Sequence, residues 1–272
     1  MAARRIVLAT RNRGKVPELQ RILSEVLPGE TEVVTLADVA PDAPDVVENG
    51  VTFEANSLLK ARAACELTGL PAIADDSGLC VGVLGGAPGI FSARWSGGLV
   101  DSTGAGPGAD KDADNIALLL AQLADVPDEE RGARFVCVAS YVDPDGLELT
   151  ARGEMHGVIL RERQGEYGFG YDPIFGVDAT EFDDAEQPQV QAAGPSSRNG
   201  SDVPDVISEV AAEGHASEVA ADAAARVGDD TPFTAGDDGA VSAAELPPEV
   251  KNAISHRGRA VRKLAAQLAP VV

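Results

Sequence analysis

Two adjacent carboxylates are the residues best suited to chemistry. Asp75-Asp76-Ser77-Gly78 is predicted to lie at the end of a short apolar strand that begins at Ala72. Because successive strand residues point to opposite faces, the two carboxylates cannot serve one site equally. We expect one to orient or anchor neighbouring groups and the other to face a cleft, where it could hold Mg²⁺ and accept a proton from attacking water. From these four residues alone, an ordinary turn is an equally good interpretation.

A polar turn between a predicted strand and a predicted helix offers a second candidate. Residues 10–15, Thr10-Arg11-Asn12-Arg13-Gly14-Lys15, follow the strand-like residues 5–9 and precede an amphipathic helix at 16–26. Free backbone N–H groups and the positive helix end at such a junction suit a phosphate chain. The turn is not a Walker P-loop, since Ala9 replaces the first Gly and Val16 the Ser/Thr. Any metal must be held elsewhere, and a solvated polar turn is the alternative.

The predicted helix at 54–67 adds a third candidate. Asn56 and Lys60 are four residues apart and therefore share one helix face. Lys60 could reach a phosphate, although most helix lysines are simply solvated, and we count both residues as candidate substrate ligands. Glu48 is a candidate second metal carboxylate with no local support.

Two later motifs suit a nucleobase. In Phe169-Gly170-Tyr171-Asp172 the glycines permit close approach of the chain and the rings offer a planar surface, although such turns are common. Lys251, His256 and Arg257 lie in a donor-rich stretch directly before a predicted helix. Donors of this kind suit the keto oxygens of a purine.

The elements that must position these residues alternate between strands and helices. Strands are predicted at 5–9, from 72, at 135–142 and at 147–153, and helices at 16–26, 54–67, 115–124 and 258–268. A turn at 143–146 joins the last two strands as a hairpin. This alternation predicts a three-layer α/β protein.

The acidic excess lies mainly in one segment. The 272 residues include 22 Lys and Arg against 44 Asp and Glu, a net charge of -22. Between Asp178 and Glu245 there are sixteen acidic and two basic residues, so this segment carries -14 and the rest -8. High charge with little to bury is typical of disorder. We expect one catalytic domain, 1–177 and 245–272, interrupted by a disordered insertion at 178–244.

The composition also excludes several classes of function. The net charge of -22 repels nucleic acid and anionic lipid. No apolar run approaches the roughly 18 residues of a membrane span. Cys65, Cys80 and Cys137 lack the spacing of a disulfide framework or thiolate zinc site. We expect a cytoplasmic protein that binds neither nucleic acid nor membranes.

Taken in order, five motifs resemble the Ham1/RdgB family of inosine triphosphate pyrophosphatases. They are IVLATRNRGKVPEL, GVTFEANSLLKARAA, LPAIADDSGLCVGVLGGAPGIFSARWSG, GFGYDPIF and ELPPEVKNAISHRGRA. The resemblance implies a long mixed sheet flanked by helices, two lobes around a substrate cleft, and a homodimer. It also implies Mg²⁺-dependent hydrolysis of ITP, dITP and XTP to the monophosphate and pyrophosphate, by water attack at the α-phosphorus, which removes these nucleotides from the pool.

The resemblance assigns roles to the candidate residues. Asp76 and Glu48 would bind Mg²⁺, with Asp76 also the general base, and residues 10–15 would hold the triphosphate beside Lys60. The base and neighbouring groups would be held by Ser77, Phe169, Gly170, Tyr171, Asp172, Lys251, His256 and Arg257. Donors at His256 and Arg257 would meet the 6-keto oxygen of hypoxanthine or xanthine, whereas the 6-amino group of adenine would oppose them.

Two other interpretations stay open at this point. One is a Maf-like nucleotide pyrophosphatase with a different base specificity. The other is a non-catalytic nucleotide-binding protein whose acidic segment recruits a partner. A substrate panel distinguishes the first, and deletion of the acidic segment the second.

Overall fold

The computed structural model describes residues 4–9, 20–23, 31–99, 101, 103, 105–106, 108–183 and 240–270. The polar turn at 10–15 lies outside these residues, as does most of the acidic segment. Of the helix predicted at 16–26, residues 20–23 are described and are helical. In the described part of the chain, no helix is both long and apolar enough to cross a membrane.

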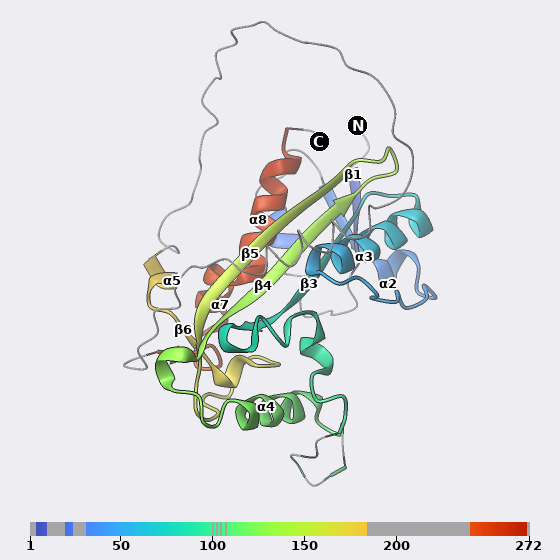
Figure 1. Cartoon of the computed structure of the whole chain (residues 1–272). Helices are drawn as coiled ribbons and strands as arrows, with labels where there is room; N and C mark the ends of the chain where they lie inside the picture. The colour runs from blue at the N-terminus through green and yellow to red at the C-terminus, as the bar shows by residue number, and fades with distance from the viewer. Residues whose placement is uncertain are drawn as a thin grey trace, which may run out of the picture.

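A seven-stranded mixed sheet forms the centre of the molecule (Figure 1). The strands are β1 (Arg4–Leu8), β2 (Thr31–Thr35), β3 (Ala72–Val81), β4 (Gly132–Val142), β5 (Glu148–Ile159), β6 (Phe175–Val177) and β7 (Val241–Ser242). Their order is β2-β1-β3-β4-β5-β6-β7. β1 is parallel to β2 and β3, and all later neighbours are antiparallel. The predicted α/β class with a mixed central sheet is confirmed.

Helices cover both faces of the long strands, which gives three layers. α3 (Phe53–Thr68) packs on β3 and β4 from one side, and α8 (His256–Leu268) packs on β4 and β5 from the other (Figure 1). The shorter helices are α2 (Leu36–Val39), α4 (Lys111–Gln122), α5 (Thr180–Asp183) and α7 (Pro248–Ile254). α4 begins earlier than predicted because Asp110 caps it by accepting a hydrogen bond from the Ala113 N–H.

The strand that carries Asp75 and Asp76 is longer than predicted. The sequence places these residues at a strand end, but β3 continues through them to Val81. β4 pairs with every residue of β3, from Ala72 opposite Val142 onward. The prediction of a strand end is therefore wrong, because pairing with a long neighbour outweighs the low strand propensity of Asp, Ser and Gly.

On the face that carries Asp75 and Ser77, β3, β4 and β5 run through two separate hydrophobic cores. From these strands, the core beneath α8 contains Ile73, Cys137, Ala139, Tyr141 and Ala151. The core beside α4 contains Leu79, Val81, Ala133, Phe135, Met155 and Ile159. On β3, Asp75 and Ser77 lie between the two sets, so this polar pair marks the place where the apolar interior is interrupted.

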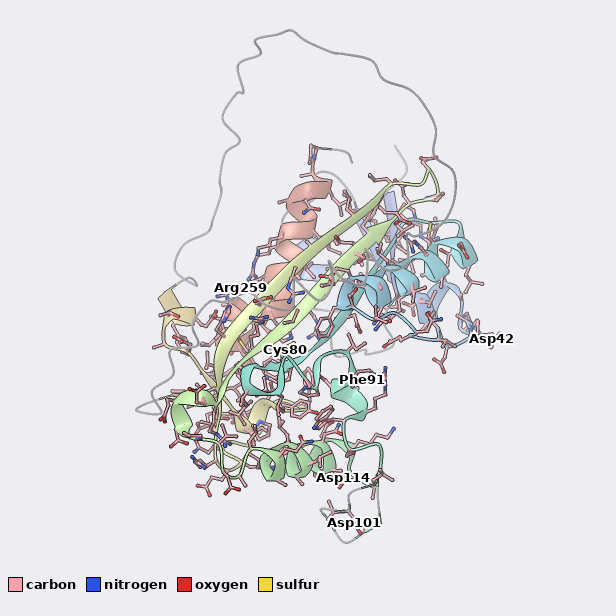
Figure 2. All side chains as sticks on the ribbon, viewed as in Figure 1. Asp42, Cys80, Phe91, Asp101, Asp114 and Arg259 are labelled. Atoms are coloured by element: carbon pink, nitrogen blue, oxygen red, sulfur yellow. The ribbon has the colours of Figure 1, made fainter. Side chains whose placement is uncertain are left out.

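The ends of the predicted insertion belong to the folded body. β7 pairs with β6, with Val241 opposite Val177, and Ala243 and Ala244 are completely buried. On the other side, the buried Glu181 of α5 accepts a hydrogen bond from a backbone N–H of β5 and forms an ion pair with Arg259 of α8, which Figure 2 labels. The expected boundaries 178 and 244 therefore move inward. Residues 184–239 lie outside the described residues, and their insertion character stays a prediction.

Candidate active site

Beside the two aspartates, β3 has no strand partner on one side among the described residues. β1 pairs with β3 only at its start, where Val7 lies opposite Ala72 and Leu8 opposite Ile73. The Ala9 N–H then donates to the Ile73 carbonyl at 2.7 Å, and no described strand pairs on this side with residues 75–78. Ligands of α/β proteins commonly bind outside the carboxyl ends of parallel strands. Ala9, the last described residue before positions 10–15, lies at this edge of β3.

Asp76 faces α3 and lies close to Lys60 and Glu48, the residues predicted to bind phosphate and metal. Lys60 Nζ donates to Asp76 Oδ1 at 2.9 Å and lies 3.3 Å from Glu48 Oε1. The side chains of Lys60 and Asp76 are 17% and 12% exposed, so solvent screens their attraction only weakly. The structure thus brings these three predicted residues together.

The surroundings shift the proton affinities of this pair. Burial lowers the pKa of Lys60, but Asp76 and then Glu48 outweigh it, so the net pKa is raised and the ammonium stays charged. Burial raises the pKa of Asp76, and the opposing effects of Lys60 and Asn56 leave it above its ordinary value. When ionised, such a carboxylate accepts a proton more readily than an ordinary Asp.

Asn56 forms hydrogen bonds to Asp76 and to the backbone of Gly50. Its side chain is completely buried. Its Oδ1 accepts a hydrogen bond from the Gly50 N–H at 2.8 Å, and its Nδ2 donates to Asp76 Oδ2 at 3.4 Å. Direct substrate binding by Asn56 stays a prediction, and in this structure its amide connects the segment after Glu48 to Asp76.

Asp75 points to the opposite face, as strand alternation predicts. Arg257 Nε donates to Asp75 Oδ2 at 3.0 Å, and Arg257 Nη2 donates to Ser77 Oγ at 3.1 Å. Both side chains of the Asp75–Arg257 ion pair are only 7% exposed. The first aspartate of the motif therefore holds an arginine of α8.

Gly153 of β5 allows α8 to lie close enough for this contact. Its register places it beside Cys137 of β4, which in turn pairs with Ser77 of β3. A Cβ on Gly153 would lie 2.2 Å from the His256 carbonyl oxygen. Glycine is therefore required where the first turn of α8 crosses the sheet, and Arg257 extends from this turn to β3.

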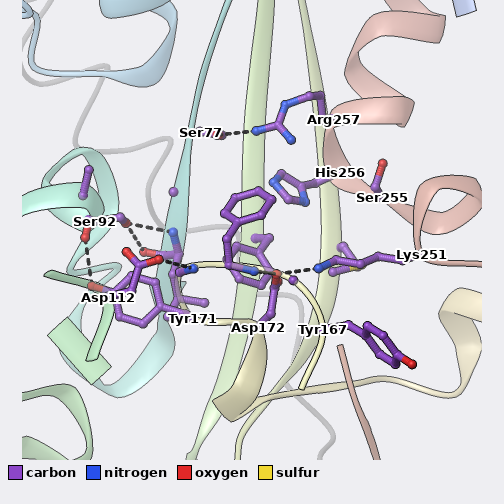
Figure 3. A pocket seen from close by; sticks show the side chains of 18 of the residues that line it. Ser77, Ser92, Asp112, Tyr167, Tyr171, Asp172, Lys251, Ser255, His256 and Arg257 are labelled. Carbon is purple, nitrogen blue, oxygen red and sulfur yellow. Dashed lines mark hydrogen bonds and ion pairs between the residues drawn. The ribbon is translucent and has the colours of Figure 1, made fainter. Parts of the chain in front are cut away.

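A cavity of about 410 Å³ opens beside Ser77 and Arg257 (Figure 3). Its volume is typical of small-molecule sites, which span roughly 300–1,000 Å³. All residues predicted to hold the base line it, namely Ser77, Phe169, Gly170, Tyr171, Asp172, Lys251, His256 and Arg257. Segments far apart in sequence thus converge as expected.

Aromatic rings give this cavity flat surfaces. The His256 ring stacks on Phe135, with centroids 5.0 Å apart and planes inclined by 13°. Phe169 is 59% exposed, and Lys251 Nζ lies 5.6 Å from its ring centroid. A planar base has two aromatic surfaces against which it can lie.

Asp172 fixes the loop that carries Phe169. Its Oδ2 accepts hydrogen bonds from Lys251 Nζ at 2.5 Å and from the Phe169 N–H at 2.8 Å. Gly168, with φ +87°, leaves room for this carboxylate, because a Cβ there would lie 2.3 Å from Asp172 Oδ2. Asp172 is itself buried, so within this structure it positions Phe169 and Lys251.

Other polar side chains that line the cavity, including Ser92, Asp112 and Asn115, were not among the candidate site residues. The Ser92 carbonyl accepts hydrogen bonds from the Tyr171 hydroxyl at 3.0 Å and from Asn115 Nδ2 at 3.2 Å. Asp112 Oδ2 accepts from the Gly170 N–H at 2.8 Å. No local pattern could have found them, because these contacts join residues 23 to 79 positions apart.

Glu48 and Asp76 fit a divalent cation that a phosphate chain completes. Both carboxylates converge on the ammonium of Lys60, so their oxygens already face one position that holds positive charge. Among the described residues there is no group of three or more His, Cys, Asp or Glu able to hold a metal. Mg²⁺ does not need one, since it is usually bound by one or two carboxylates together with waters and substrate phosphates.

Comparisons with known proteins agree with this geometry. The Ham1 family model matches residues 6–200 and 202–267. A dITP/XTP pyrophosphatase of Nocardia farcinica is 41% identical, over 99% of this chain and 97% of that protein. One from Streptomyces avermitilis is 52% identical, over 62% of this chain and 79% of that protein. The solved structure of the Staphylococcus aureus Ham1 protein has a TM-score of 0.65 at 30% identity, covering 99% of this chain and all of that one.

Proposed function

Because this chain belongs to the Ham1 family, we propose that it hydrolyses non-canonical purine nucleoside triphosphates (ITP, dITP and XTP) to the monophosphate and pyrophosphate. The dITP/XTP pyrophosphatases among its relatives support this activity. One structural observation carries the proposal. Asp76, which contacts Lys60, and Ser77, which lines the base-sized cavity, are consecutive residues at an open strand edge.

The proposed substrate crosses this edge. Its base lies in the cavity between Phe169 and the stacked His256, and its phosphates extend past Ser77 toward Asp76 and Lys60. Residues 10–15 are proposed to complete the phosphate site. The position of Ala9, which directly precedes them in sequence and bonds to Ile73 of β3, supports this. This placement explains why the two sets of polar residues occupy opposite faces of one strand and still serve one extended ligand.

In the proposed reaction Asp76 is the general base. Mg²⁺ held by Asp76 and Glu48 would withdraw charge from the phosphate oxygens and lower the pKa of a bound water. Asp76 Oδ2, which has the longer of the two side-chain contacts, accepts the proton of the attacking water. A bond forms between the water oxygen and the α-phosphorus, and the bond from that phosphorus to the α,β-bridging oxygen breaks. Lys60 offsets the negative charge on the pyrophosphate as it leaves.

Donors in the cavity support selection of keto purines. Arg257 and His256 line the cavity, and in the proposed complex their N–H groups donate to the 6-keto oxygen. Adenine presents an amino group there, so a buried donor would lose its partner at a cost of about 1–3 kcal/mol. Selectivity then follows from a mismatch of hydrogen bonds rather than from the size of the base.

A substrate panel tests this function. The protein with Mg²⁺ is given ITP, dITP, XTP, ATP, GTP and pyrimidine triphosphates, and pyrophosphate and orthophosphate are measured separately. We expect pyrophosphate from ITP, dITP and XTP, with much slower turnover of ATP. Orthophosphate as the product, or equal turnover of ATP, contradicts the proposal. Preference for other bases would instead support the Maf-like alternative, and binding without turnover the non-catalytic one.

We also propose a homodimer that acts in the cytoplasm, as the family resemblance implies. Cys65, Cys80 and Cys137 are buried and form no disulfide, which supports a reducing compartment. Light scattering coupled to size-exclusion chromatography measures the assembly directly. A mass near that of the 28.0 kDa chain contradicts the dimer.

A further inference from the structure

Arg257 occupies an electrostatically unfavourable position in its own helix. It is the second residue of α8 and lies in the first turn, at the positive end of the helix dipole, where the Ser255 hydroxyl accepts a hydrogen bond from the Gly258 N–H. A buried cation at this end is repelled by the helix that carries it. Its side chain is only 7% exposed, so water compensates this repulsion only weakly. Another group must therefore stabilise the guanidinium.

Asp75 supplies that compensation from a different element. Its carboxylate accepts from Arg257 Nε at 3.0 Å, and the two residues are 182 positions apart in sequence. Ser77 on the same face of β3 accepts from Nη2 at 3.1 Å. Because the guanidinium is a rigid planar group, two bonds to one strand fix both its place and the direction of its plane.

The direction of this plane matters because Arg257 lines the base cavity (Figure 3). Asp75 itself is not among the residues that line the cavity, and it lies on the face of β3 opposite Asp76 and Lys60. The direct contact of Asp75 with the cavity lining is therefore through Arg257. On the other face of β3, the charge of Asp75 adds a small effect that raises the pKa of Lys60, and this effect is common to ITP and ATP.

We propose that Asp75 is a positioning residue that sets base selectivity by holding Arg257 in the orientation that favours a keto purine. This inference rests on the proposed function. Loss of the Asp75 charge leaves Arg257 in place along the chain but allows its guanidinium to turn. Discrimination between ITP and ATP then falls, while the chemical step at Asp76 proceeds.

A double-mutant cycle tests the proposal. Asp75→Asn, Arg257→Met and the double variant are assayed with ITP and ATP, and kcat and KM are measured separately. We expect Asp75→Asn to lower the ITP-to-ATP ratio of kcat/KM by about tenfold, which corresponds to about 1.4 kcal/mol, mainly through KM. In the Arg257→Met background the same change should alter the ratio less than twofold. The proposal is overturned if Asp75→Asn leaves the ITP-to-ATP ratio of kcat/KM unchanged. It is also overturned if the change of this ratio in the double variant is the product of the changes in the two single variants.

A matched control separates positioning from general stabilisation. Glu148→Gln weakens another carboxylate–arginine pair, with Arg62, which lies outside the cavity. The ITP-to-ATP ratio of kcat/KM in Glu148→Gln should equal that of the wild type. The thermal stability of each variant is measured alongside, so that a loss of stability can be told from a loss of selectivity. Asp75→Ser is a second neutral variant with the same expected shift, for use if Asp75→Asn does not fold.

The outcome is separable from that of the proposed function. Calorimetric titration of ITP and ATP into the same variants in EDTA, without Mg²⁺, measures base discrimination without turnover. If the wild type releases no pyrophosphate from ITP, the proposed function fails. The role of Asp75 is then decided by whether Asp75→Asn narrows the difference between the two dissociation constants.

Discussion

Asp75 and Asp76 are consecutive residues whose carboxylates bind side chains of two different helices on opposite faces of the sheet. Asp75 pairs with Arg257 of α8, and Asp76 with Lys60 of α3. Strand alternation produces this separation. The groups proposed for base binding and for phosphate chemistry are therefore held by one strand, and substitutions at the two aspartates should have different kinetic effects.

Asp76→Asn should abolish most of the catalysis without unfolding the protein. The amide preserves the size of the side chain but cannot accept a proton, and general-base catalysis contributes about 10²–10⁴-fold. We expect kcat for ITP to fall by about 100-fold or more. Steady-state pyrophosphate release measures this, and Asp145→Asn in the exposed hairpin turn is the control. Retention of more than half the activity would exclude Asp76 as the base.

Glu48→Gln should raise the requirement for magnesium. Its carboxylate converges with Asp76 on one position, and a neutral amide is a poorer ligand for a hard cation. We expect the Mg²⁺ concentration for half-maximal rate to rise about tenfold or more. Chelation with EDTA should stop turnover of the wild type, and added Mg²⁺ should restore it. The control is Glu54→Gln, at a carboxylate that pairs with Arg152. This variant should need the same Mg²⁺ concentration for half-maximal rate as the wild type.

Tyr171→Phe should remove the hydrogen bond that joins two segments lining the cavity. Burial, and to a smaller extent Asp112, raise the pKa of Tyr171, so its hydroxyl remains a donor to the Ser92 carbonyl across the working pH range. Loss of this bond should cost about 1 kcal/mol of stability and raise KM more than it lowers kcat. Urea denaturation and steady-state kinetics measure the two effects. Tyr167→Phe, at a residue 62% exposed, should leave stability unchanged.

Cys80 should react slowly with alkylating reagents near neutral pH. Burial raises the pKa of its thiol to about 11, an effect that Arg134 and Arg152 only partly oppose. Since the thiolate is the reactive form, alkylation by iodoacetamide should accelerate as the pH rises toward that value. Mass spectrometry of modified peptides follows the reaction, and the urea-unfolded chain provides the fast reference. Rapid modification of Cys80 in the native protein at pH 7.5 would contradict this assignment.

Removal of residues 184–239 should leave turnover intact. β6 and β7 remain paired through Val177 and Val241, and Glu181 stays bonded to Arg259, so both ends of the deleted segment are held by the folded body. A short Gly/Ser linker can join them at little entropic cost, because loop closure depends only weakly on length. We expect kcat and KM for ITP within about twofold of the wild type. A large rise in KM would instead assign the acidic segment a part in substrate binding.

The parts of the site that could be predicted from sequence depend on local periodicity. The opposite orientations of Asp75 and Asp76 follow from the two-residue repeat of a strand, and the shared face of Asn56 and Lys60 follows from helical spacing. Both contacts to Asp76 are present. The burial of Asn56 was not predictable, because it depends on Gly50 and the segment that packs over it.

Features that depend on distant segments could not be read from sequence. β3 extends past Gly78 because β4 pairs with it, although its own residues are typical of a turn. Ala243 and Ala244 share the composition of the acidic, Ala-rich segment but are buried against the folded body. Composition averages over a window and therefore blurs such boundaries, whereas burial is decided residue by residue.

The continuity of β3, β4 and β5 through both cores limits how the molecule can move. One half of the molecule surrounds the core beneath α8, and the other half surrounds the core beside α4. The two halves are joined by backbone-paired strands rather than by a flexible linker, so a change in their relative angle must twist the sheet itself. Such bending is elastic and distributes its cost over many hydrogen bonds. We therefore expect amide hydrogen exchange in the middle of β4 to stay slow throughout turnover. Entry and release of nucleotide would then depend on side chains and short segments at the strand edge, with little movement of the halves.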